Sequence, residues 1–181
     1  RRVTPLLKYL AAEKAVEAAR KCLQIHGGAG FTTEYGAEKL LRDSLVFPIY
    51  EGTSQIQSLM AMKDTLGAIM KDPKGFLTRS AQALWRSRSA RDDLERDVAE
   101  LQRISLEVQR HLITRTATDK ARSLRGTPVA SWPKTFTKDW NPKRDFSYAM
   151  LHAERLTRIL TDTVIADLLW KQAQSHPDRR V

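Results

Sequence analysis

The strongest candidate for a chemically active group in this sequence is Glu51, within the segment YEGTSQ at residues 50–55. A carboxylate beside a glycine leaves room for a bound molecule, because glycine adds no side chain of its own. Such a carboxylate can act as a general base when burial raises its pKa toward neutrality. The structural alternative is that Thr53 or Ser54 caps a helix and Glu51 is a solvated acid that complements the helix dipole. On this segment alone, both interpretations stay open.

A second candidate lies at residues 24–30, where the sequence is QIHGGAG. Gly27 and Gly28 can adopt positive φ and leave backbone amides uncovered, and uncovered amides suit the oxygens of a phosphate. The alternative is a helix C-cap followed by a turn in which Gly30 keeps the backbone loose. Glycine is the commonest residue just past a helix end, so the segment taken alone favours the cap.

The two segments together form a longer pattern: QIHGGAGF at 24–31, EY at 34–35, EKL at 38–40, RD at 42–43 and IYEGTSQIQ at 49–57. In order, spacing and residue type this pattern resembles the C-terminal signature of the acyl-CoA dehydrogenase family. The resemblance covers about residues 4–67, roughly a third of the chain. It implies a flavoprotein with an N-terminal helical domain, a middle β-domain and a C-terminal four-helix domain, normally assembled as a tetramer. Residues 4–67 would be the last three helices of that final domain.

The resemblance assigns cofactor contacts by position, with FAD as the expected cofactor and no metal. Gln24, Gly27 and Gly28 match the loop that contacts the adenosine diphosphate part of FAD, generally the FAD of the neighbouring subunit. Thr53 and Gln55 match residues that hold FAD after the catalytic turn.

At the reacting centre, the resemblance implies that Glu51 removes the α-proton of an acyl-CoA thioester while hydride leaves the β-carbon for flavin N5. Tyr50 and Gly52 would flank the thioester as substrate-binding residues, and the amide of Glu51 would donate to the thioester oxygen with a ribityl hydroxyl. The developing enolate needs preorganised donors, and the base needs a pKa raised by burial against acyl chain and flavin. Some branches of the family place the base on another helix, but the acid is present here, which favours the commoner arrangement.

The elements that carry these residues are all expected to be helical. Thr4-Pro5 is a good helix start, and the stretch behind it reaches Leu23 before the glycines stop it. Further helices are expected over 37–46 and from 54 to about 70. No segment shows the alternation of a strand, so the expected fold class is an all-α helical bundle.

Asp72-Pro73-Lys74-Gly75 is the best boundary in the chain, and it divides a partial acyl-CoA dehydrogenase C-terminal domain (1–71) from a helical C-terminal extension (72–181). The extension holds an apolar stripe expected to pack against the last helix, at about 146–174: Leu94, Val98, Leu101, Ile104, Val108 and Leu112. That helix is expected to turn its own stripe inward: Leu151, Leu156, Ile159, Leu160, Val164, Leu168 and Leu169. Residues 126–146 are expected to form a loop pinned to the bundle by Trp132, Phe136 and Trp140.

Composition restricts the class of protein. Hydrophobic residues make up 41% and charged residues 29%, which is typical of a globular protein, and no apolar run approaches the length of a membrane span. The single Cys22 excludes an internal disulfide and a cysteine-based metal site, so a reducing, cytoplasmic location is expected. The chain opens on Arg1 without an initiator Met, so we expect a fragment that is inactive by itself.

The net charge of +10 is unevenly placed, because residues 1–67 carry +2 and residues 68–181 carry +8. Arg96, Arg103 and Arg110 recur every seven residues and, with the neighbouring arginines, would form a strip for a polyanion. The alternative, which the interleaved acids favour, is a solvated helix face. Nucleic acid is therefore not an expected partner.

The expected function is part of an FAD-dependent acyl-CoA dehydrogenase that catalyses α,β-dehydrogenation in fatty acid metabolism. The expected partners are the acyl-CoA substrate, an electron-transfer flavoprotein as electron acceptor and further copies of the same protein, as a dimer or tetramer. Two alternatives remain: a flavin acyl-CoA oxidase, and a DNA-binding or scaffolding flavoprotein that uses the basic extension. The acyl chain length cannot be deduced from these residues.

Overall fold

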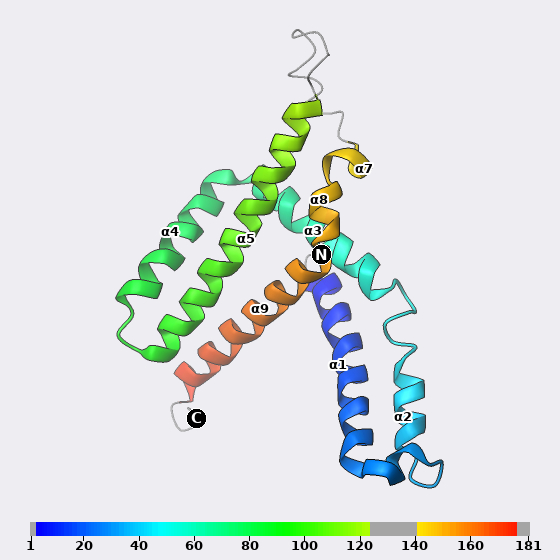
Figure 1. Cartoon of the computed structure of the whole chain (residues 1–181). Coiled ribbons are helices and arrows are strands. Elements are labelled where there is room, and N and C mark those ends of the chain that lie inside the picture. The colour runs from blue at the N-terminus through cyan, green and yellow to red at the C-terminus, as the bar shows by residue number, and fades with distance from the viewer. Residues whose placement is uncertain (1–2, 124–140, 177–181) are drawn as a thin grey trace. The chain divides into compact units, whose positions relative to one another are not determined.

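A computed structural model of the chain describes residues 3–123 and 141–176 (Figure 1). Every regular element in those residues is a helix, which confirms the all-α fold class. The chain forms two compact units, residues 1–61 and residues 62–181. The aromatic residues expected to pin a loop, Trp132, Phe136 and Trp140, lie outside the described residues.

The first unit is built on α1 (Val3–His26) and α2 (Ala37–Ser44), which lie side by side and antiparallel (Figure 1). Ala12 and Ala19 of α1 and Ala37 of α2 are buried. Small side chains allow two helices to approach closely, so this pair packs through alanine. The close pairing brings the chain after α2 back along α1, toward its N-terminal half.

Gly27 ends α1, as the sequence predicted, and adopts a φ of 60°. The next turn is a short 3₁₀ helix, η1 (Gly27–Phe31). Gly30 does not keep this backbone loose, contrary to expectation. It is buried, and a Cβ there would lie 2.6 Å from the carbonyl oxygen of Leu23. Gly30 is needed because η1 folds tightly onto the last turns of α1.

α3 (Ser54–Lys71) and α4 (Pro73–Ser89) are separated by Asp72 alone. The Asp72 side chain accepts a hydrogen bond from the Gly75 amide at 2.9 Å and so caps α4, with Pro73 at its first position. A Cβ on Gly75 would lie 2.0 Å from an Asp72 carboxylate oxygen. The boundary predicted at these residues is therefore a sharp helix junction, while the domain limit placed at residue 71 stays a prediction.

The second unit is centred on α5 (Asp93–Ser123), which packs against both α4 and α9 (Ala153–Ser175) (Figure 1). The 94–112 helix packs against the last helix as expected, but of the predicted stripe only Val98 and Leu112 are buried, while Leu94 is 42% exposed and Ile104 39%. Its core contains Phe76 and Ala83 of α4, Val98 and Leu112 of α5, and Leu156 of α9.

Arg86 of α4 joins these three helices through its guanidinium group. It donates to Glu95 at 3.2 Å and to Gln102 at 3.4 Å, and it stacks 4.8 Å from the ring centre of Trp170 on α9. Gln102 in turn donates to Asp167 of α9 at 3.1 Å. Planar, multiply bonded guanidinium groups suit such junctions better than a lysine ammonium does.

The last helix differs from the prediction in two respects. Residues 142–145, expected to be loop, form the short helix α7 (Pro142–Asp145), and α8 (Ser147–Leu151) is separated from α9 at His152. The stripe expected to face inward is largely exposed: Leu151 77%, Val164 48%, Leu168 54% and Leu169 59%.

Two threonines, Thr157 and Thr161, share the buried face of α9 with Ala153 and Leu156. Their hydroxyls donate to carbonyl oxygens of their own helix, Thr157 to Ala153 at 2.9 Å and Thr161 to Arg158 at 2.7 Å. A threonine satisfied in this way can be buried, but it does not register in an apolar periodicity.

A buried ion pair closes the far end of this unit. Lys120 of α5 donates to Asp145 of α7 at 3.0 Å, and both side chains are fully buried. The Asp145 carboxylate also accepts from the Asn141 amide at 2.9 Å and from Arg144 at 2.8 Å. Burial raises the pKa of Asp145, but these hydrogen bonds outweigh burial and lower the pKa to about 2.

Replacing Lys120 with Met should destabilise the second unit, because it removes a direct cationic partner from a buried carboxylate. The expected loss is about 3 kcal/mol in the free energy of unfolding, measured by denaturant titration. Lys171→Met is the matched control, because Lys171 is exposed and pairs with Asp167 within one helix; it should cost about 0.5 kcal/mol or less. Equal losses in the two variants would contradict a structural role for the buried pair.

The same carboxylate should make stability depend on acid pH. The pKa of Asp145 is lowered from an ordinary value of 3.8, so its contribution is fully present above about pH 4 and is lost as the pH falls toward 2. The difference in unfolding free energy between the wild type and Asp145→Asn should therefore shrink between about pH 5 and pH 2. A difference that is constant over this range would mean that Asp145 does not titrate in this way.

Candidate functional site

The turn between α2 and α3 presents Glu51 in an unusual backbone conformation. Glu51 has a φ of 50° and Gly52 a φ of 91°, and Glu51 is the only non-glycine residue with positive φ in the described part of the chain. A glutamate in the left-handed region is uncommon and is maintained only where the surroundings fix it. The turn therefore has to be held by specific contacts.

Contacts within the turn begin with the helix cap. The Thr53 hydroxyl accepts from the Ile56 amide at 3.2 Å, so Thr53 rather than Ser54 caps α3. Gln57 reaches back from the first turn of α3 and donates to the Glu51 carbonyl oxygen at 3.1 Å. The Ser54 amide donates to the Pro48 carbonyl oxygen at 2.9 Å and closes the loop.

Two residues of α1 fix the turn from outside. The Ser54 hydroxyl donates to Glu13 at 2.6 Å. Lys8 donates to the carbonyl oxygen of Phe47, and its ammonium lies 4.7 Å from the ring centre of Tyr50. Sequence reasoning missed Lys8 and Glu13, because they lie some forty positions away and no local motif marks them.

The side chains expected at the reacting centre lie on the surface of this unit. Glu51 and Gln55 are exposed, Tyr50 is 44% exposed, and Gly52 and Thr53 are partly covered. The described residues therefore do not bury Glu51. Burial of this carboxylate would have to come from groups outside the described residues.

The other expected cofactor residues, Gln24, Gly27 and Gly28, form a separate exposed group at the C-terminal end of α1. Gln24 lies eleven residues beyond Glu13 on the same helix, which corresponds to about 16 Å. The two predicted groups are thus not brought together on one copy of the chain. A Cβ added at Gly27 or Gly28 would meet nothing within 4 Å, so this backbone is open to a large polar group.

Within residues 3–123 and 141–176, no three His, Cys, Asp or Glu side chains cluster so that they could hold a metal ion. None of the described helices combines the length and apolarity needed to cross a membrane.

Comparison with known proteins identifies the first third of the chain. The family model for the C-terminal domain of acyl-CoA dehydrogenases matches residues 1–66. Residues 1–66 are therefore similar to that C-terminal domain. The matched acyl-CoA dehydrogenase segment contains all of the residues discussed above, from Lys8 to Gln57.

Curated relatives agree with this assignment. An acyl-CoA dehydrogenase of Bacillus subtilis is 47% identical over 62 residues, which is 34% of this chain and 16% of the relative. A subunit of the caffeyl-CoA reductase–Etf complex of Acetobacterium woodii is 47% identical over 55 residues, 30% of this chain and 14% of the relative. The chain thus spans about a sixth of the length of the relatives it matches. No solved structure matches it significantly.

A third relative extends the similarity beyond the acyl-CoA dehydrogenase segment. The 3-methylmercaptopropionyl-CoA dehydrogenase of Ruegeria pomeroyi is 40% identical over 83 residues, 45% of this chain but only 13% of the relative. A match of this length must run past Leu66 into the second unit. The matched segment is longer than that of the Bacillus relative but makes up a smaller share of the Ruegeria protein, so the Ruegeria protein is the longer of the two relatives.

Gly52→Ala should destabilise the turn that carries Glu51. The new Cβ would strain a residue at φ 91° and would lie 2.6 Å from the Gln57 amide nitrogen that bonds Glu51. We expect a loss of about 1–2 kcal/mol in unfolding free energy. Gly67→Ala is the matched control, since Gly67 lies within α3 with nothing within 4 Å of its added Cβ, and it should stabilise by about 0.5–1 kcal/mol. Denaturant titration of both variants tests this, and a neutral Gly52→Ala would contradict it.

Proposed function

We propose that this chain supplies the catalytic base, and part of the cofactor surface, of an FAD-dependent acyl-CoA dehydrogenase. The proposed reaction is α,β-dehydrogenation of an acyl-CoA thioester, with Glu51 as the base. The observation that carries the proposal is the position of Glu51: it lies in the matched family segment, on a turn held in the left-handed region and open to an incoming molecule.

The proposed chemistry requires four groups of this turn. Glu51 takes the α-proton of the thioester, and the flanking Gly52 leaves space for the acyl group. The Glu51 amide would donate to the thioester oxygen as negative charge develops there, and preorganised backbone donors are effective in that role. Tyr50, with its ring held by the Lys8 ammonium, would border the thioester on the other side.

The residues present fit FAD in two separate places. Thr53 and Gln55, at the start of α3, would hold FAD near the reacting centre, and FAD when bound would accept the hydride from the β-carbon. Gln24, Gly27 and Gly28 would contact the adenosine diphosphate part of FAD, which the family resemblance assigns to the FAD of a neighbouring copy in a homo-oligomer.

An electron-transfer flavoprotein is the proposed electron acceptor, in keeping with the relative that is named as part of an Etf complex. An acyl-CoA oxidase would use the same base and differ only in how the reduced cofactor meets oxygen. The DNA-binding alternative gains no support from the arginines at intervals of seven, because Arg96 pairs with Asp93 and Arg110 lies 3.9 Å from Glu107. Arg103 bonds Glu100 at 2.6 Å and Glu107 at 2.9 Å.

The test uses the whole flavoprotein of which this chain forms part, as wild type and as Glu51→Gln. Anaerobic addition of acyl-CoAs of increasing chain length should bleach the flavin of the wild type and identify the substrate. Glu51→Gln should bind the same acyl-CoA but reduce flavin at least about a thousandfold more slowly, since it lacks the base. Glu17→Gln is the matched control: it removes a partly exposed carboxylate of α1, away from the Glu51 turn, and should bleach normally.

Two outcomes would overturn the proposal. If wild-type protein binds FAD but no acyl-CoA bleaches it, the chain does not serve this reaction. If Glu51→Gln bleaches as fast as the wild type, the base is another residue. Admitting air to the reduced protein then separates the two enzyme classes, because rapid reoxidation by oxygen indicates an oxidase.

A further inference from the structure

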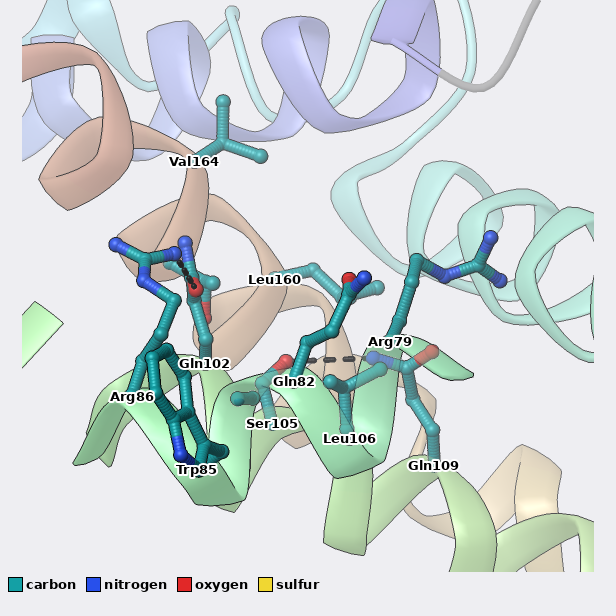
Figure 2. A pocket seen from close by; sticks show the side chains of 12 residues that line it. Arg79, Gln82, Trp85, Arg86, Gln102, Ser105, Leu106, Gln109, Leu160 and Val164 are labelled. Carbon is teal, nitrogen blue, oxygen red and sulfur yellow. Dashed lines mark hydrogen bonds between the residues drawn. The ribbon is translucent and has the colours of Figure 1, made fainter. Parts of the chain in front are cut away.

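The second unit contains a cavity of about 530 Å³ that is lined by α4, α5 and α9 (Figure 2). Its volume falls within the range of about 300–1,000 Å³ that is typical of small-molecule sites. The lining residues all follow residue 66, so the cavity lies outside the family match and is independent of the proposed catalytic function.

The walls of this cavity are mainly apolar. They include Trp85 of α4, Leu106 of α5, and Leu160 and Val164 of α9. Trp85 is 70% exposed and Val164 48% exposed, although both are large apolar side chains. Covering this surface would remove apolar area from water, which favours an apolar ligand body.

The charges around the cavity are of one sign. Arg79 and Arg86 both line it, and none of its lining residues is a carboxylate. Arg86 is already neutralised by Glu95 at 3.2 Å. Arg79 is exposed, and no acid among the described residues forms an ion pair with it. The uncompensated positive charge is therefore at the Arg79 end.

The spacing of these groups sets the shape of a ligand. Arg79 and Arg86 lie at opposite ends of the lining (Figure 2), seven residues or about 10 Å apart along α4. An anionic head at Arg79 would leave an alkyl chain to run along Leu106 and Leu160 toward Trp85 and Val164. A medium-length alkyl chain spans that distance.

We propose that the α4–α5–α9 cavity binds a small amphipathic anion, an alkyl carboxylate with its head at Arg79 and its chain against Trp85. Two independent features carry this proposal, the apolar walls and the unpaired cation at one end. We take this ligand to be a free monomeric carboxylate rather than the same chemistry presented by a lipid surface, because the apolar walls that would receive its chain lie between three helices.

Isothermal titration calorimetry on the full 181-residue chain tests the proposal with monomeric decanoate and, as a neutral analogue, decanol. Decanoate should bind one site saturably and more tightly than decanol. Arg79→Gln should weaken decanoate about fivefold and leave decanol unchanged, because it removes only the exposed charge. Trp85→Ala should weaken both ligands by about the same factor, roughly tenfold, because it removes apolar wall.

Arg155→Gln is the matched control, since Arg155 is an exposed arginine of α9 that does not line the cavity. Its decanoate affinity should equal that of the wild type. The proposal is overturned if decanoate does not saturate, if Arg79→Gln and Arg155→Gln lower its affinity alike, or if Trp85→Ala has no effect. It is also overturned if anionic phosphatidylglycerol vesicles bind the chain while monomeric decanoate does not.

Discussion

The first unit depends on a backbone constraint: two consecutive residues, Glu51 and Gly52, must stay in the left-handed region. Only glycine tolerates this conformation without cost, so Glu51 requires outside support. That support comes from three directions: the Thr53 cap, the Gln57 side chain and the contacts that Lys8 and Glu13 make from α1. The antiparallel pairing of α1 with α2 brings the turn within reach of those α1 residues. The packing of α1 against α2 through alanine is therefore also what positions the Glu51 carboxylate.

The same unit leaves much apolar surface uncovered. Ile25 is 83% exposed, Phe31 80% and Ile49 65%, and these residues surround the two groups expected to contact FAD. Patches of this kind usually mark interfaces, because isolated globular domains seldom leave them in water. Their positions agree with the proposal that neighbouring parts of a larger flavoprotein, and a second copy of it, cover this unit. They also explain why Glu51 is exposed here although a base of this kind needs a buried environment.

Local signals in the sequence were sufficient for the helices of the first unit and for the turn, but not for the short helix α7 or the break at His152. Gly27, Pro73 and the apolar spacing of the 94–112 stretch predicted helix ends and the pairing of α5 with the last helix. What escaped prediction depended on tertiary contacts. Thr157 and Thr161 could not be identified as core positions, because their own helix satisfies their hydroxyls. Glu13 could not be linked to Ser54, because a single hydrogen bond across forty-one positions leaves no periodic trace. The individual site roles of Gln24, Gly27, Gly28, Tyr50, Gly52, Thr53 and Gln55 remain predictions that rest on the resemblance.

The second unit carries an excess of positive charge, and the structure shows which of its arginines pair with acids. In the sequence, arginines at intervals of seven predict a basic strip. In the structure, Arg96 bonds Asp93, Arg103 is held between Glu100 and Glu107, and Arg122 pairs with Asp119. The hydrogen bond from Arg103 also lowers the pKa of Glu100. A polyanion would have to displace these acids, at a cost that a solvated strip would not impose. Arg79, by contrast, lies beside apolar walls in a cavity that no carboxylate lines.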